Sequence, residues 1–247
     1  MIRSALYRPL AVVMCALFIP AVGATTVVVP DSLVATEGNS NNAFPFNLGI
    51  SGDPSMRYQQ VYDASQFASL SGPTHISAIR FRPDSTDGHA FASVLSDVQI
   101  NLSTTSAMVD GLSSVFADNV GADDTIVHSG SLALSSIDSA GPGDTRAFDI
   151  SISLQTPFLY DPTLGNLLLD VRNFDGGSTT QFDAADVFDD GTSRVFATDF
   201  DAPTGSVRTL GLVTQFEFGS IAVPEPAALL LVGLGLAGFG LGRRRSA

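Results

Sequence analysis

The side chains with which this chain of 247 residues could do chemistry are three histidines, one cysteine and 25 acidic residues. Nucleophilic hydrolysis needs a serine or cysteine beside a histidine that an acid orients, and a zinc site needs clustered histidines and cysteines. The sequence has no GxSxG, HExxH or CxxC pattern. We therefore interpret His75 and His128 as residues on strand surfaces and His89 as a solvated turn residue.

Paired carboxylates are the other route to hydrolysis, because a glycosidase places two of them about the sugar bond that it cleaves. With 25 acids the count carries no information, but sugar clefts also offer aromatic platforms, and the chain has no tryptophan. Tyr58, Tyr62 and Tyr160 could stack on a sugar, although a strand tyrosine more often lies at a rim with a solvated hydroxyl. We predict that the protein is not an enzyme. An exported hydrolase of extracellular polysaccharide is the alternative.

Aspartate-rich turns offer the hard oxygen ligands that calcium prefers. The densest run of aspartates, over residues 183–190, has neither the spacing of an EF-hand nor a nonapeptide repeat. We interpret the acidic turns as a source of solubility that also discourages pairing between sheet edges, with calcium as the alternative cofactor. The run has four carboxylates within eight residues, namely Asp183, Asp186, Asp189 and Asp190.

The elements that must position these residues show the period of two that is typical of half-buried strands. In residues 148–154, apolar side chains take every second place and polar ones lie between them. Turn residues separate such runs, and no long helical pattern alternates with them. The pattern predicts an all-β domain, an antiparallel β-sandwich or jelly roll. The predicted strands cover 57–62, 79–82, 98–103, 125–129, 131–136, 148–154, 167–172, 193–198, 207–213 and 214–218, with room for helical turns in 63–70 and 106–119.

The central part of the chain, residues 25–222, is acidic and is predicted to be one domain. It contains seven arginines against 24 acidic residues and no lysine, which gives a net charge of −17. Nucleic acid needs a basic face on its partner, so this charge argues against nucleic-acid binding. Phenylalanine is expected to supply the core, because each ring buries a large area without a polar atom.

The first 24 residues have the three parts of a secretory signal peptide. Arg3 and Arg8 give a positive start, residues 10–22 are apolar, and small residues precede the expected cleavage site after Ala24. An apolar run of this length spans only about 20 Å as a helix, which is short for a hydrocarbon core of about 30 Å. The segment is therefore predicted to direct export and then to be removed.

The C-terminal segment, residues 223–247, contains a short motif, an apolar run over 227–241 and a basic end. The apolar run gives about 22 Å of helix, a short but sufficient transmembrane span. Positive residues stay in the cytoplasm, so the central domain is predicted to lie on the far side of the membrane. The motif and the basic end consist of Val223, Pro224, Glu225 and Pro226, and of Arg243, Arg244 and Arg245.

This order of motif, apolar helix and arginine cluster resembles the PEP-CTERM sorting signal of Gram-negative bacteria. The same kind of segment is also labelled an ice-binding-protein C-terminal domain, although the label implies no ice-binding surface here. The resemblance implies that an exosortase-type processing enzyme recognises residues 224–226 and removes the helix, so that the inner membrane is a transient anchor. It also implies a place at the cell surface or in the extracellular matrix, associated with exopolysaccharide and biofilm.

Overall fold

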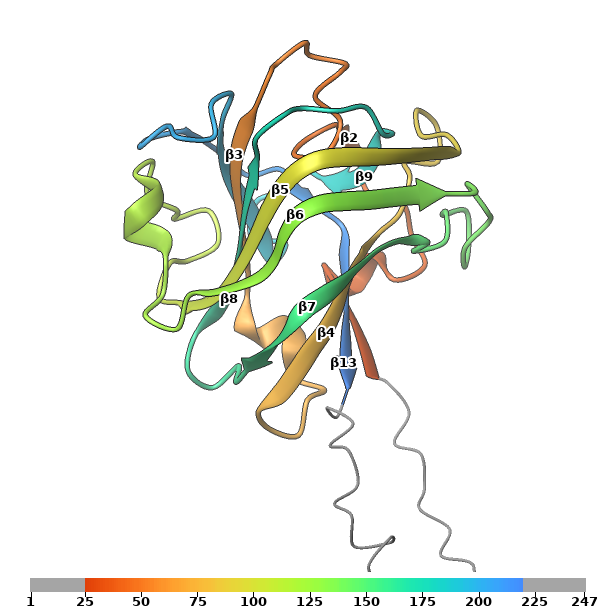
Figure 1. The fold of residues 1–247 in the computed structure, drawn as a ribbon. Helices are drawn as coiled ribbons and strands as arrows, with labels where there is room; N and C mark the ends of the chain where they lie inside the picture. Colours follow the sequence, from red (N-terminus) through yellow and green to blue (C-terminus); the bar gives the residue numbers. More distant parts are fainter. Residues whose placement is uncertain (1–24, 220–247) are drawn as a thin grey trace, which may run out of the picture.

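The computed structural model describes residues 25–219 (Figure 1). Its strand pairings are all antiparallel, which confirms the predicted all-β fold. Three single turns of 3-10 helix lie between strands, namely η1 (Asp31–Leu33), η2 (Ala64–Phe67) and η3 (Phe116–Asn119). The strands are β1 (Thr25–Val29), β2 (Ser40–Asn42), β3 (Met56–Tyr62), β4 (Thr74–Phe81), β5 (Phe91–Thr105), β6 (Thr125–Ser136), β7 (Ile150–Tyr160), β8 (Asn166–Asn173), β9 (Phe182–Ala185), β10 (Thr192–Ala197), β11 (Ser206–Arg208), β12 (Gly211–Leu212) and β13 (Thr214–Gly219).

Two large sheets form the body of the domain (Figure 1). The four-stranded sheet has the order β1-β13-β4-β7, and the six-stranded sheet has the order β11-β10-β3-β8-β5-β6. A third, three-stranded sheet has the order β12-β9-β2. Because β7 and β8 follow each other in the chain but belong to different large sheets, residues 161–165 form a corner between the sheets.

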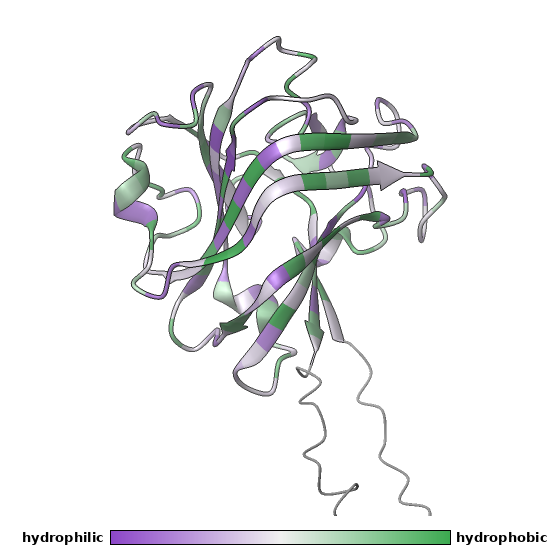
Figure 2. Ribbon diagram, in the orientation of Figure 1, coloured by the Kyte–Doolittle hydropathy of each residue, from purple (hydrophilic) through white to green (hydrophobic). Residues whose placement is uncertain are grey.

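One face of each large sheet is buried because apolar side chains recur at every second position. In β13, Phe216 and Phe218 are buried, whereas Gln215 and Glu217, which alternate with them, are half-buried. The same alternation is visible as bands of colour along β5 and β6 in Figure 2. The buried faces of the two sheets share one hydrophobic core.

Phenylalanine dominates this core, as the composition predicts. The ring of Phe67, from η2, lies 5.1 Å from that of Tyr160, 5.6 Å from that of Phe216 and 6.1 Å from that of Phe218, measured between centroids. Complete burial of one such side chain stabilises a fold by about 1.5–3 kcal/mol. The cluster joins η2 to both sheets, since Tyr160 and Phe216 come from different strands of the four-stranded sheet and Tyr62 of β3 packs edge-on against Phe216.

A second, smaller core lies on the outer face of the six-stranded sheet. Residues 106–120, which we call the covering segment, pack Leu112 and Phe116 against Val61, Leu168 and Val195. This contact explains why Leu168 is apolar although its neighbours in β8 alternate. The covering segment leaves the adjoining part of the same face open.

The predicted strands are recovered, with three differences. Residues 125–129 and 131–136 form one strand, β6, which continues through Gly130 at a φ of 103°. The predicted strand over 207–213 is divided between β11 and β12, which lie in different sheets. The predicted helical turns are η2 and η3, whereas β1, β2 and β9 have no counterpart among the predicted strands.

The predicted flanking segments, the signal peptide over 1–24 and the transmembrane helix after 222, lie outside the described residues. Within residues 25–219, no helix is long and apolar enough to cross a membrane.

Candidate functional site

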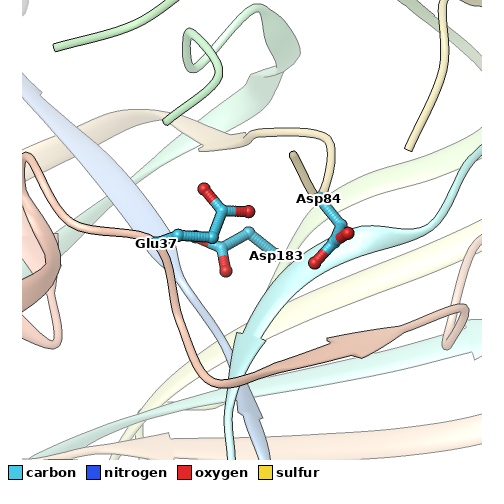
Figure 3. Close-up of side chains that lie close together, drawn as sticks. All are labelled: Glu37, Asp84 and Asp183. Atoms are coloured by element: carbon cyan, nitrogen blue, oxygen red, sulfur yellow. The ribbon is translucent and has the colours of Figure 1, made fainter. Parts of the chain in front are cut away.

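Three carboxylates converge where the three-stranded sheet meets the end of β4 (Figure 3). Glu37 precedes β2, Asp84 follows β4, and Asp183 lies in β9. One oxygen atom from each lies within 4.8 Å of the others, and this is the one such group of acidic, histidine or cysteine residues among residues 25–219. The three-carboxylate cluster therefore joins segments that are far apart in the sequence.

Arg82 neutralises part of the charge of this cluster. Its side chain is fully buried, and its Nε atom donates to Oδ2 of Asp183 at 2.7 Å while one terminal nitrogen forms an ion pair with the same oxygen. That nitrogen also donates to the backbone oxygens of Leu33 and Thr36, and the guanidinium lies 4.8 Å from the ring centroid of Phe148. Removal of either partner of such a buried ion pair destabilises the fold, because the remaining charge has no compensation.

Backbone N–H groups occupy most of the remaining carboxylate oxygens. Oδ1 of Asp183 accepts from Gly38, Oε1 of Glu37 accepts from Ser85, and Oδ1 of Asp84 accepts from the two N–H groups that follow in its turn. Oε2 of Glu37 is buried without a hydrogen-bond partner. Burial raises the pKa of Glu37, with the charge of Asp183 acting in the same direction, and burial likewise raises the pKa of Asp183 against the opposing effect of Arg82.

The chemistry of this donor set fits a structural clamp better than a calcium site. Calcium takes six to eight oxygen ligands, whereas most carboxylate oxygens here already accept N–H groups and Asp183 is committed to Arg82. The raised pKa of Glu37 instead favours a proton on the unpartnered oxygen as the pH falls. The cluster thus holds β2, β4 and β9 together.

The four predicted calcium ligands do not come together as a group within the described residues. Asp183 belongs to the three-carboxylate cluster, and Asp186 and Asp189 are exposed. Asp190 is half-buried in the turn after them, where its Oδ1 atom accepts from the N–H and hydroxyl of Thr192. Burial raises the pKa of Asp190 to about 6.

The three tyrosines that could have stacked on a sugar are all fully buried, so the prediction of rim positions is wrong. Their hydroxyls are satisfied internally: Tyr58 donates to Gln60, Tyr62 bonds to the hydroxyl of Thr214, and Tyr160 donates to a backbone oxygen. They therefore belong to the core. Of the histidines, His75 is half-buried, His89 is exposed, and His128 is buried rather than on the surface as predicted.

A polar groove of about 670 Å³ lies on the open part of the outer face of the six-stranded sheet. Its floor is formed by β3, β8 and β5, and the covering segment contributes Ala117 and Val120 to one side. We call this feature the outer groove. Its polar lining consists of Arg57, Gln99, Asn101, Asp124, Asp170 and Arg172.

Two hydrogen-bonded groups hold the lining of the outer groove. Asp170 forms an ion pair with Arg57 at 2.9 Å and accepts from Nε2 of Gln59 at 2.7 Å. On the other side, Asn101 accepts from Gln99 and donates to both carboxylate oxygens of Asp124, at 3.0 and 2.9 Å. These hydrogen bonds and the ion pair fix the polar side chains of the lining other than Arg172.

The covering segment takes part in this network. The guanidinium of Arg57 lies 4.6 Å from the ring centroid of Phe116, and the buried side chain of Asn119 donates to Gln59. Sequence reasoning missed the outer groove because it predicted the strands over 57–62, 98–103 and 167–172 one at a time. Only the pairing of β3, β8 and β5 brings them together.

The described part of the chain belongs, by its fold, to the class of antiparallel β-sandwich proteins. More particularly, a family model for the PEP-CTERM protein-sorting motif matches residues 222–245. The chain therefore carries the C-terminal signal of an exported protein that is sorted through an exosortase. The predicted motif at 223–226 and the arginines at 243–245 fall within the matched residues, and they lie outside the described ones, as does Ala24. No curated protein matches the chain.

Proposed function

We propose that this chain is a non-enzymatic protein of the cell surface or extracellular matrix, which associates with extracellular polysaccharide after an exosortase has released it from the inner membrane. The observation that carries the proposal is the sorting motif at residues 222–245, which begins directly behind β13. The acidic sandwich is then the part that reaches the exterior. Its net charge, from seven arginines and 24 acids, favours solubility there.

The position of the two ends supports delivery of an intact domain. Thr25, the residue after the expected signal cleavage site, pairs with Phe218 near the end of β13. The first and last strands of the described domain therefore lie side by side (Figure 1). Removal of the signal peptide and of the C-terminal segment leaves every strand pairing of the described sandwich in place.

One observation favours a hydrolase as the second candidate. Asp124 and Asp170 line the same outer groove, and although Asp124 is partly open to solvent, desolvation raises its pKa, as a general acid requires. The surrounding contacts weigh against this function. Asn101 occupies both oxygens of Asp124, and Asp170 is neutralised by Arg57, so neither carboxylate is free to act as a nucleophile or base.

The full chain expressed in a host with an exosortase tests the proposal. We expect mass spectrometry to find a product that begins at Thr25 and ends near Glu225. In fractionation of the culture, this product should be recovered with the extracellular polysaccharide. The variant Glu225→Ala should keep residues 243–245 and remain with the membrane, whereas the control Asp144→Asn, an exposed acid of the domain, should behave like the wild type.

Two outcomes would contradict the proposal. A processed product that stays in the medium free of polysaccharide would exclude the association. New reducing ends in purified polysaccharide incubated with the product would establish the hydrolase instead.

A further inference from the structure

The outer groove is separate from the ends that carry the sorting signals, because it lies on the six-stranded sheet while β1 and β13 belong to the other large sheet. We infer that this groove binds a neutral polysaccharide chain through the hydroxyl groups of its sugar rings. The inference rests on the proposed function, since it names the surface by which the sandwich holds the polysaccharide.

The polar residues on the floor of the groove are arranged in rows that run across the strands. Arg172 on β8 lies opposite Arg57 on β3 and opposite Gln99 on β5. Adjacent strands are about 4.8 Å apart, a spacing close to the repeat of a pyranose chain. Successive sugars of a chain laid across the strands therefore meet successive polar side chains. In a second row, two residues away on each strand, Asp170 on β8 and Asn101 on β5 lie opposite each other in the lining, and Gln59 on β3 is fully buried and supports Asp170 through a hydrogen bond.

These side chains are in position before a ligand arrives. Arg57 and Asp170 each have only 11% of their side-chain surface exposed, and the ion pair between them is supported by the fully buried Gln59. Asn101 is held between Gln99 and Asp124. A sugar hydroxyl that enters the groove meets fixed donors and acceptors, so binding costs little side-chain entropy.

Arg172 supplies the donors that this network leaves unused. It is half-buried, it lines the groove, and it has no salt bridge or hydrogen-bond partner among residues 25–219. A guanidinium carries five N–H donors in a planar fork, which suits two neighbouring hydroxyls of one ring. Ile126, 49% exposed on the adjoining strand, offers an apolar surface for the C–H face of the sugar.

The charge of the groove selects neutral chains over anionic ones. Two arginines and two aspartates line it, so its formal charge is balanced. The whole domain carries a large negative excess, which repels a polyanion at a distance. Hydroxyl groups match both signs of charge at once, because they can accept from Arg172 and donate to the second lone pairs of carboxylate oxygens that already accept one hydrogen bond.

Affinity electrophoresis of the processed, secreted protein in gels with dextran, hydroxyethyl cellulose or alginate tests the inference. We expect at least one neutral polymer to retard the wild type and alginate not to do so. Arg172→Ala should raise the apparent dissociation constant for that polymer at least tenfold, and Arg172→Gln should also weaken it. The control Arg208→Ala removes an exposed arginine of β11 that lies outside the groove and should bind like the wild type. Equal thermal unfolding of all four proteins shows that the fold is unchanged.

The possible failures are distinguishable. If neither neutral polymer retards the wild type, or if alginate alone does, the inference is wrong. If a neutral polymer binds but Arg172→Ala and Arg172→Gln bind equally well, the polysaccharide association stands and the outer groove is not its site. If the processed protein also stays free of the extracellular polysaccharide in culture, the proposed function fails with the inference.

Discussion

Arg82 is the residue on which the three-carboxylate cluster depends, because within residues 25–219 it is the one buried cation that faces Asp183. We predict that Arg82→Ala lowers the free energy of unfolding by about 3–5 kcal/mol, since it leaves a buried carboxylate without its partner. The double variant Arg82→Met with Asp183→Asn removes both charges and keeps an acceptor for the N–H of Gly38. Urea unfolding should show that it recovers at least half of the loss; equal losses in both variants would contradict the role of the pair.

Asp190 makes the stability of the domain dependent on pH. Desolvation raises its pKa from 3.8 to about 6, and the charges of Asp110 and Asp186 add to this against the hydrogen bonds from Thr192. The native state then binds a proton more tightly than the unfolded state, so the free energy of unfolding falls as the pH rises from about 4 to 6. For a fully buried carboxyl, this rise of the pKa corresponds to a loss of about 3 kcal/mol in the free energy of unfolding. Because Asp190 is only half-buried, solvent screening reduces the loss to about 1 kcal/mol.

The variant Asp190→Asn keeps the acceptor for Thr192 and removes the ionisation. At pH 7.5 we expect urea unfolding to give this variant a free energy of unfolding about 1 kcal/mol higher than that of the wild type. At pH 4 the two free energies should be nearly equal. Asp144→Asn, at an exposed position, is the matched control. A gain that is equal at both pH values would show that ionisation of Asp190 is not the cause.

Calcium should have little effect on the described domain. A site filled at 100 times its Kd would raise the free energy of unfolding by about 2.7 kcal/mol, but the carboxylates that converge already accept N–H groups. We expect thermal unfolding in millimolar calcium and in chelator to coincide. A clear upward shift in calcium that Asp183→Asn abolishes would restore the metal site, and a shift that Asp189→Asn abolishes would place it at the exposed aspartates.

At the scale of elements, sequence periodicity predicted the strands whose two faces differ in polarity. Residues 148–154 and 214–218 alternate strictly; residues 150–154 and all of 214–218 lie in strands with one buried face. The short strands β2 and β9 were missed because a run such as Ser-Asn-Asn has no apolar period, and an ion pair rather than hydrophobic burial holds Asp183 inside. The outer groove was missed for a related reason, since the sequence of one strand does not determine which residues of a distant strand lie opposite it.

Gly130 is the residue that lets β6 continue as one strand where two were predicted. Its φ of 103° is disfavoured for residues with a side chain, and a Cβ atom there would meet nothing within 4 Å, so the cost of substitution is confined to the backbone. We predict that Gly130→Ala destabilises the domain by about 1–2 kcal/mol. Gly219→Ala, where φ is not positive and the nearest atom is 3.8 Å away, should change stability by less than about 0.5 kcal/mol. Similar urea midpoints for the two variants would contradict this account.

For the whole molecule, the pairing of the first strand with the last makes completion of the four-stranded sheet depend on the last residues of the described domain. β13 lies between β1 and β4, and it buries Phe216 and Phe218 in the shared core. The four-stranded sheet is therefore complete only when residues 214–219 have joined it. The match to the sorting motif begins at residue 222, directly after this strand.

This dependence on β13 predicts a sharp difference between two C-terminal truncations of the domain that begins at Thr25. A chain that ends at Val213 lacks β13, so β1 and β4 each lose a neighbouring strand. The core also loses two phenylalanine side chains, each of which stabilises the fold by about 1.5–3 kcal/mol when buried. We expect this chain to be digested rapidly by protease and to lack a cooperative urea transition. A chain that ends at Ala222 keeps every described pairing, and its urea midpoint should equal that of the product released by the exosortase. A cooperative transition in the shorter chain would show that the sandwich folds without its last strand.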